Sequence, residues 1–171
     1  MHRLIAAGAL AAVLAGQPAS ADVKAGDIPA ALNPDKLAIY LETEATGAQI
    51  YACSKNASGA WAWTLKAPDA TLTDTAKKPV GKHYAGPTWE GLDGGKVVGG
   101  VKASMPAPTP GAVAWLLLEV KSHEGSGTFT QAKAIVRMNT NGGVAQAQGC
   151  DEAHSGSESR VPYTATYVFL K

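Results

Sequence analysis

The fold class is decided by the C-terminal stretch Pro162-Tyr163-Thr164-Ala165-Thr166-Tyr167-Val168-Phe169. Its large residues Tyr163, Tyr167 and Phe169 recur at even spacing, which places them on one face of a β-strand. The same alternation occurs earlier, in Ala60-Trp61-Ala62-Trp63-Thr64-Leu65, where large apolar side chains alternate with small or polar ones. Both segments therefore predict half-buried strands.

Short apolar segments separated by turn residues fill the rest of the chain. The most apolar one after the leader is Ala114-Trp115-Leu116-Leu117-Leu118-Glu119-Val120, which predicts a central strand with both faces buried. After the leader, no window of about a dozen residues keeps apolar groups at helical spacing. About eight short strands at roughly 8–15-residue spacing predict an all-β domain, an antiparallel β-sandwich, with a compact β-barrel as the alternative.

Three further segments carry expectations about where strands end. We expect the first strand to stop at Thr46-Gly47, and we expect Lys66–Lys82 to be a loop because of its prolines and its Thr and Asp residues. Proline-rich Ser104–Gly111 is expected to be an extended connection. These two loops would cover the second face of the central strand and place His83 at the rim of a cleft.

The first 21 residues resemble a secretory signal peptide. An apolar stretch over Leu4–Ala15 is followed by Ala19-Ser20-Ala21, which supplies small residues before a cleavage site. Residues 22–36 lack periodicity and predict an extended lead-in, and residues 37–171 predict a single all-β domain. We therefore expect an exported protein, either periplasmic or extracellular.

The composition excludes several classes of protein. The 171 residues are 17% charged and 46% hydrophobic, which is too apolar for a disordered chain of such low net charge. The 15 basic residues face 14 acidic ones, and Arg3 lies in the leader, so the exported chain is formally neutral. A neutral chain has no electrostatic reason to bind nucleic acid. No apolar run of about 18 residues follows the leader, so we expect no membrane span.

The two cysteines, Cys53 and Cys150, are an even pair in a chain expected to be exported. An oxidising compartment favours a disulfide between them. Neither cysteine has sequence neighbours that indicate a reactive thiol or a metal ligand. We therefore expect one structural disulfide that closes a loop of about 100 residues.

A candidate ligand-binding site is predicted in His83-Tyr84-Ala85-Gly86-Pro87-Thr88-Trp89 and the turn that follows it. The candidate residues are His83, Tyr84, Trp89 and Asp93. An imidazole, a phenol and an indole gathered at a turn can bind a small polar ligand such as a glycan. The alternative is structural: His83 donates to a backbone carbonyl, and Trp89 plugs one end of the sandwich.

The sequence predicts no catalytic residue, cofactor or metal site. His83, His123 and His154 lack metal-ligand spacings, and there is no GxSxG, phosphate loop or CxxC motif. Our hypothesis is a non-catalytic binding domain for an envelope or extracellular ligand. Two alternatives remain: a small secreted hydrolase that uses His83 with a carboxylate, and a structural or protein-interaction domain.

Several short segments, taken in the order of the sequence, carry a resemblance to a protein family. They cover nearly all of the chain after the leader. These segments are Gln49-Ile50-Tyr51-x-Cys53, Trp63, His83–Trp89 (HYAGPTW), Asp93-Gly94, Ala114–Leu118 (AWLLL), Gly127-x-Phe129, Arg137-x-x-Thr140-x-Gly142-Gly143, Cys150 and Tyr163-x-Ala165-x-Tyr167-x-Phe169. Together they resemble a family of exported bacterial and fungal proteins of unknown function. The resemblance implies export and one shared fold, and it implies no reaction.

Overall fold

The computed structural model describes residues 22–34 and 36–171. The predicted signal peptide, residues 1–21, lies outside the described residues. In the described ranges, no helix has the length and apolar character needed to cross a membrane.

The described residues form eight β-strands and four short 3-10 helices. The strands are β1 (Ile39–Lys55), β2 (Trp61–Thr73), β3 (Pro79–Tyr84), β4 (Thr88–Gly91), β5 (Lys96–Met105), β6 (Trp115–Glu124), β7 (Ala134–Gly142) and β8 (Glu158–Leu170). The 3-10 helices are η1 (Ala25–Asp27), η2 (Ala30–Leu32), η3 (Thr128–Gln131) and η4 (Glu152–His154).

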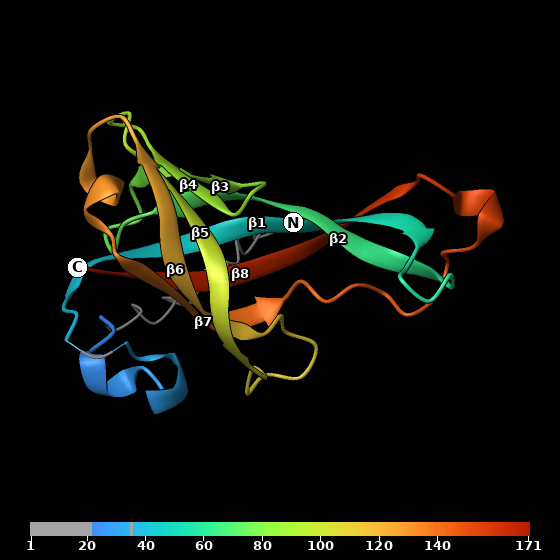
Figure 1. Ribbon diagram of the computed structural model, residues 1–171, viewed down its shortest axis with the longest axis horizontal. Helices are drawn as coiled ribbons and strands as arrows, with labels where there is room; N and C mark the ends of the chain where they lie inside the picture. Colours follow the sequence, from blue (N-terminus) through green and yellow to red (C-terminus); the bar gives the residue numbers. More distant parts are fainter. Residues whose placement is uncertain (1–21, 35) are drawn as a thin grey trace, which may run out of the picture.

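Each strand pairs antiparallel with its neighbour in sequence, and β8 also pairs with β1, so the sheet closes into a ring (Figure 1). The all-β class and the expected number of strands are confirmed. Of the two architectures that the sequence left open, the structure has the closed one instead of two facing sheets. Closure pairs both edge strands, which removes the exposed backbone groups of an open edge. The ring is uneven, because β1 has 17 residues and β4 has 4.

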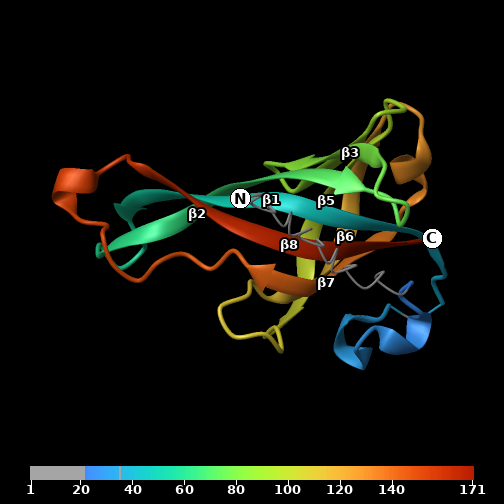
Figure 2. The same ribbon diagram turned by 180° about the vertical axis from the view of Figure 1, so that it is seen from behind.

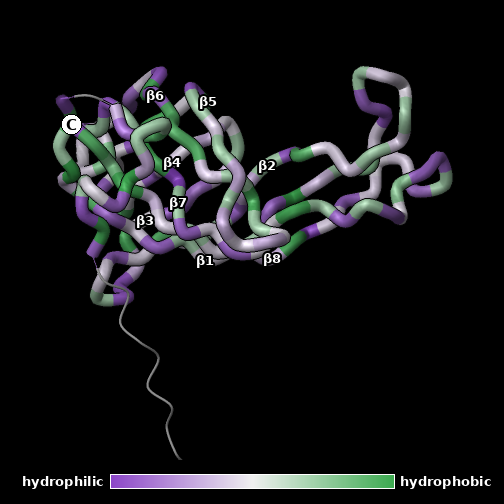
Figure 3. The backbone as a smooth tube through the Cα atoms, turned by 90° about the horizontal axis from the view of Figure 1, so that it is seen from below, coloured by the Kyte–Doolittle hydropathy of each residue, from purple (hydrophilic) through white to green (hydrophobic). Residues whose placement is uncertain are grey.

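The longest strands extend beyond the ring as an arm (Figures 1 and 2). The β1–β2 hairpin continues its pairing out to Lys55 and Trp61, and the loop that carries η4 lies at the same end of the molecule. In Figure 3, hydrophobic segments are concentrated in the strands of the ring, whereas hydrophilic residues mark the tips of the arm. The ring therefore contains the core.

Alternation along β8 divides its side chains between the inside and the outside of the ring. Tyr163, Tyr167 and Phe169 share one face, as the sequence predicts, and belong to the buried interior cluster. Their neighbours Val168 and Leu170 belong to a second buried cluster on the outer face of the sheet. The interior cluster also includes Leu72, Trp89, Val97, Leu118, Phe129 and Ile135.

The outer cluster is covered by the N-terminal segment. Ile28 and Leu32, at the ends of η1 and η2, are 4% and 0% exposed and pack with Leu117, Val136 and Met138. Of the two loops expected to cover this face, Lys66–Lys82 does not pack on it, and Ser104–Gly111 contributes Met105, the last residue of β5. The N-terminal segment supplies the rest of the cover, with Val23 and Leu37 packing beside Ile28 and Leu32. Residues 22–34 accordingly hold two 3-10 turns where the sequence indicated an extended lead-in.

Two segments expected to lie outside strands are paired. Thr46-Gly47 lies inside β1, because Gly47 lets β2 approach closely: a Cβ atom there would overlap the carbonyl oxygen of Asp69. Most of the expected loop Lys66–Lys82 belongs to β2 and β3. Pro68 is tolerated because β2 pairs at that position with β1 only, its pairing with β3 starting at Ala70.

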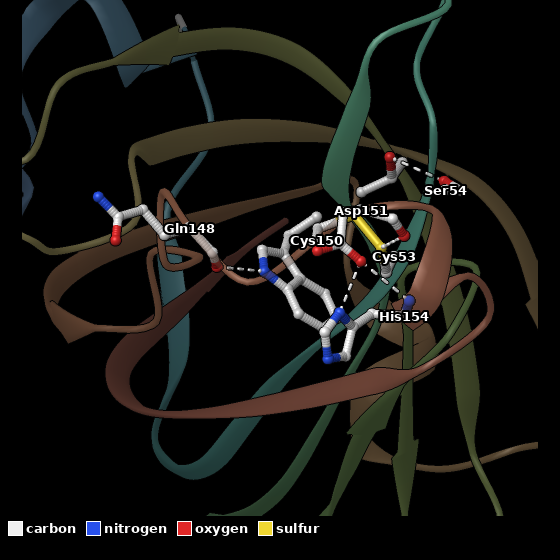
Figure 4. The surroundings of a disulfide bond; sticks show 8 residues. Cys53, Ser54, Gln148, Cys150, Asp151 and His154 are labelled. Carbon is white, nitrogen blue, oxygen red and sulfur yellow. Dashed lines mark hydrogen bonds and ion pairs between the residues drawn. A yellow bond between two sulfur atoms is a disulfide. The ribbon is translucent and has the colours of Figure 1, made fainter.

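The expected disulfide between Cys53 and Cys150 is confirmed, with a distance of 5.3 Å between the Cα atoms (Figure 4). It ties the end of β1 to the loop that precedes η4. The backbone N–H of Cys53 also donates to Ser157, at 2.9 Å, and the Trp63 indole donates to the carbonyl oxygen of Gln148, at 2.9 Å. Covalent and hydrogen bonds together hold the loop on the arm.

Truncation of Leu117 or Leu118 to alanine tests whether both faces of β6 are covered. The two side chains are 6% and 2% exposed and lie in the outer and interior clusters, respectively. Each variant should lower the free energy of unfolding by about 2–5 kcal/mol in denaturant melts. Leu92→Ala is the control, since Leu92 is 77% exposed and should lose less than about 0.5 kcal/mol. A loss below about 1 kcal/mol for Leu117→Ala would contradict the proposed covering of the outer face.

Removal of the disulfide should destabilise the fold strongly. The bond closes a long loop, because Cys53 and Cys150 are 97 residues apart in the sequence. In the chain-entropy model, a Cys53→Ser/Cys150→Ser double variant loses about 4–5 kcal/mol. Its melting temperature, measured beside that of the wild type, checks this. Thiol titration of the unreduced wild type should detect no free thiol, and detection of two would refute the pairing.

Candidate functional site

His83 and Trp89 face each other across the β3–β4 hairpin and point into the ring. They are register partners, and their rings stack with centroids 4.3 Å apart and planes at 18°. The hairpin turn between them contains Gly86, whose φ of 96° favours glycine. The two side chains are 2% and 0% exposed, and Tyr167 contacts both of them from β8. This pair is therefore an element of the ring interior.

The imidazole of His83 is held in one neutral form. Its Nδ1 lies 2.8 Å from the carbonyl oxygen of Thr88, so Nδ1 carries the proton and donates it. Burial lowers the pKa of His83 to about 3, although the hydrogen bond to Thr88 opposes the shift. The other ring nitrogen, Nε2, is consequently a hydrogen-bond acceptor at neutral pH.

Tyr84 lies on the opposite face of β3, outside the ring. Its hydroxyl donates to Glu90 Oε2 at 2.7 Å, and Lys82 lies 3.5 Å from the same oxygen. The hydrogen bond to Glu90 is the main cause of the raised pKa of Tyr84. The period-two alternation of the strand separates Tyr84 from His83.

Asp93 lies at the other end of β4, in the turn to β5. Its carboxylate accepts hydrogen bonds from the backbone N–H groups of Thr128, at 2.6 Å, and Gly95, at 3.1 Å. The hydrogen bond from Thr128 contributes most to the lowered pKa of Asp93. Asp93 thus fastens the turn to the start of η3. Of the four candidate residues, the structure brings together only His83 and Trp89.

A cavity of about 250 Å³ opens into the ring beside this pair. Its walls come from strands on all sides of the ring and from the β3–β4 turn. The apolar wall residues are Leu65, Ala67, Pro68, Pro87, Trp89, Val101, Leu116 and Leu118, and the polar ones are Gln49, Lys66, His83, Arg137 and Tyr167. A mostly apolar cavity with a few convergent polar groups is typical of small-molecule sites.

Two buried polar atoms beside the cavity have no hydrogen-bond partner among the described residues. They are Nε2 of Gln49 and Nε1 of Trp89. The side chain of Gln49 is 1% exposed. A buried polar group without a partner costs about 1–3 kcal/mol, so such groups in a native structure point to a further partner. Both can donate a hydrogen bond.

Arg137 brings a positive charge to the same cavity. It lies on the inward face of β7, in register with Leu116 on one side and Tyr167 on the other. Its Nε and Nη2 atoms donate to the carbonyl oxygen of Ala114, at 3.0 and 2.8 Å. No Asp or Glu of the described residues lines the cavity, and no salt bridge between described residues involves Arg137.

Sequence reasoning missed Gln49, Arg137 and Tyr167 as members of a site. Each appears in a segment that carries the family resemblance, but they lie on β1, β7 and β8 and meet only because the ring closes. One available signal was the position of Arg137 inside the apolar segment Ala134-Ile135-Val136-Arg137-Met138. A charge in an otherwise buried strand indicates a functional or paired group.

The described residues contain no group of three or more His, Cys, Asp or Glu side chains that could hold a metal ion. The arrangement offers hydrogen-bond donors, one cation and apolar walls. Its chemistry is therefore that of a binding cavity for a molecule with hydrogen-bond acceptors.

Residues 34–171 match a family described as "Protein of unknown function (DUF3455)", and the chain belongs to this family. The resemblance inferred from the sequence is confirmed in that respect. A search of curated proteins returned no match, and neither did a search of solved structures.

The buried, neutral His83 should make stability depend on pH. Its pKa is about 3 in the folded chain and near 6.5 in an unfolded one, so below pH 6.5 the unfolded state binds a proton that the folded state does not. The free energy of unfolding should therefore fall as the pH drops, by about 2 kcal/mol between pH 7.5 and 5 from this group.

Denaturant melts of the wild type and of His83→Phe at both pH values check this expectation. The variant should lack this part of the pH dependence, whatever its stability at pH 7.5. Leu118→Ala is the control, since it removes buried apolar contacts of the ring interior and changes no titratable group, and it should keep the pH dependence of the wild type. Equal pH dependence in the wild type and His83→Phe would contradict a buried neutral imidazole.

Proposed function

We propose that this protein binds a small, largely apolar molecule in the cavity inside its ring, without transforming it chemically. The observation that carries the proposal is the cavity itself, with the unpartnered polar atoms of Gln49 and Trp89 along its wall. A closed sheet of about eight strands has an interior wide enough for core side chains or for one small ligand.

The opening of the cavity supports an apolar ligand. Leu65 and Val101 line it and are 53% and 58% exposed, although both are large hydrophobic residues. Pro68 and Pro87 extend the apolar lining. Apolar groups that surround the entrance of a cavity lose contact with water when an apolar ligand enters.

The surroundings of His83 give little support to the alternative of a secreted hydrolase. General-base catalysis needs a base whose pKa lies near the working pH, often oriented by a carboxylate. The pKa of His83 is lowered to about 3, its Nδ1 faces the carbonyl oxygen of Thr88, and no described Asp or Glu lines the cavity. We therefore favour binding over catalysis.

A glycan is a less favourable ligand than an apolar molecule. Sugar rings commonly stack on accessible aromatic faces, but Trp89 is 0% exposed and already stacks on His83. Tyr84 lies outside the ring, where it binds Glu90. An interaction domain that uses a free sheet edge has less support as well, since the ring pairs its edge strands.

Export to the periplasm or the extracellular space is part of the proposal. The sequence of residues 1–21 and the disulfide between Cys53 and Cys150 support it. Disulfides persist in oxidising compartments and are rare in reducing ones. A non-catalytic carrier or receptor of small molecules fits such a location.

A substitution at the mouth of the cavity tests binding there. Titration with the neutral probe 1-octanol, followed by calorimetry and by NMR shifts of the wall residues, should show saturable binding of one molecule per chain. Val101→Trp should fill the mouth and weaken binding at least tenfold.

Leu92→Trp is the matched control, since Leu92 is exposed and does not line this cavity. It should bind 1-octanol as the wild type does. The proposal is wrong if none of 1-octanol, octanoate and octylammonium binds. It is also wrong if Val101→Trp binds these probes as tightly as the wild type does.

A further inference from the structure

We infer that the ligand of this cavity is an amphiphilic carboxylate, such as a medium-chain fatty acid, and that Arg137 binds its head group. This inference rests on the proposed function and names the chemical class of the ligand. Four observations carry it: the position of Arg137, its missing counter-charge, the donors around it and the apolar path to the opening.

The guanidinium of Arg137 is anchored but keeps unused hydrogen-bonding capacity. Of its five N–H groups, those on Nε and Nη2 that face the carbonyl oxygen of Ala114 are used. The Tyr167 hydroxyl also interacts with the guanidinium, and the donors that are left lie beside the cavity that Arg137 lines. A planar guanidinium with adjacent free donors is suited to bind a carboxylate with two parallel hydrogen bonds.

The charge of Arg137 is surrounded by neutral groups. Its register partners on the neighbouring strands are Leu116 and Tyr167, and Gln49 and His83 line the same cavity. All four are neutral, because burial lowers the pKa of His83 to about 3. Arg137 is partly buried and has no acidic partner among the described residues, so an anion from outside the chain would be its partner.

The other basic residue at the cavity already has a partner. Lys66 forms an ion pair with Glu158 near the base of the arm. The unbalanced charge at the cavity is therefore that of Arg137, which lies on the inward face of β7 and not at the mouth. This position places the head group of a ligand inside the ring.

Unpartnered donors converge on the same region. Nε2 of Gln49 and Nε1 of Trp89 have no partner among the described residues, and both side chains line the cavity with Arg137. A carboxylate accepts several hydrogen bonds at once and would satisfy these donors together with the guanidinium.

The path from Arg137 to the opening is apolar. Leu116 and Leu118 line the interior part, and Leu65 and Val101 lie at the exposed part. A cavity of about 250 Å³ is small for a ligand site, which favours a chain of medium length whose end reaches the opening. A polar head inside and an apolar tail toward the mouth match this arrangement.

A set of eight-carbon probes tests the inference: octanoate, 1-octanol and octylammonium, titrated into the full chain at pH 7.5. Octanoate should bind at least tenfold more tightly than 1-octanol, and octylammonium more weakly than either. Added salt should weaken octanoate binding and leave 1-octanol unchanged. If 1-octanol binds as tightly as octanoate, the carboxylate inference is wrong while the proposed function stands. If no probe binds, both are wrong.

Arg137→Met removes the charge and keeps an apolar stem. It should reduce octanoate affinity to that of 1-octanol while the affinity for 1-octanol changes less than threefold. Arg160→Met is the control, because Arg160 is exposed, pairs with Asp69 and does not line the cavity. If Lys66→Met, and not Arg137→Met, abolishes the preference for octanoate, the assignment of the head group to Arg137 is overturned. Should Arg137→Met fail to fold, the probe series on the wild type still decides the charge preference.

Discussion

The antiparallel pairing of β1 with β8, which runs from Ile39–Leu170 to Ala52–Glu158, closes the sheet and creates its interior. Inward-facing side chains of a closed sheet have to fill the space between the strands, or leave room for a ligand. Near one end, Phe129 stacks on Phe169 with ring centroids 4.8 Å apart, and the space is filled. Beside the β3–β4 turn, the inward side chains leave the cavity of about 250 Å³.

Closure also fixes the electrostatics of the interior. Burial keeps His83 neutral, so it adds no second positive charge beside Arg137. The described salt bridges involve solvent-exposed groups, such as the Arg160–Asp69 pair, where screening makes them weak. Inside, the charge of Arg137 acts in a less polar medium and therefore at greater strength. The interior is thus positive although the chain as a whole is close to neutral.

The sequence predicted the fold class well because strand alternation is a local property. The even spacing of Tyr163, Tyr167 and Phe169 predicted their shared face correctly. It predicted the disulfide from compartment and cysteine number. From the sequence, Tyr84 and His83 were predicted to belong to one site. Their adjacent positions in a strand place them on opposite faces instead. Gln49 and Arg137 could not be assigned to one site, because their proximity follows from closure, a long-range property that no local pattern encodes.

The N-terminal segment over the outer face has a consequence for colloidal behaviour. It is held by the buried side chains of Ile28 and Leu32, by the partly buried Val23 and Leu37, and by the hydrogen bond from Val23 N–H to Glu42, and it adds no strand to the sheet. A segment without strand pairing opens locally at lower free energy than the fold as a whole. Detachment would uncover an apolar area on β7 and β8 of the kind that drives self-association. The family match begins at residue 34, so most of the N-terminal segment that covers this apolar area lies outside the matched part of the chain.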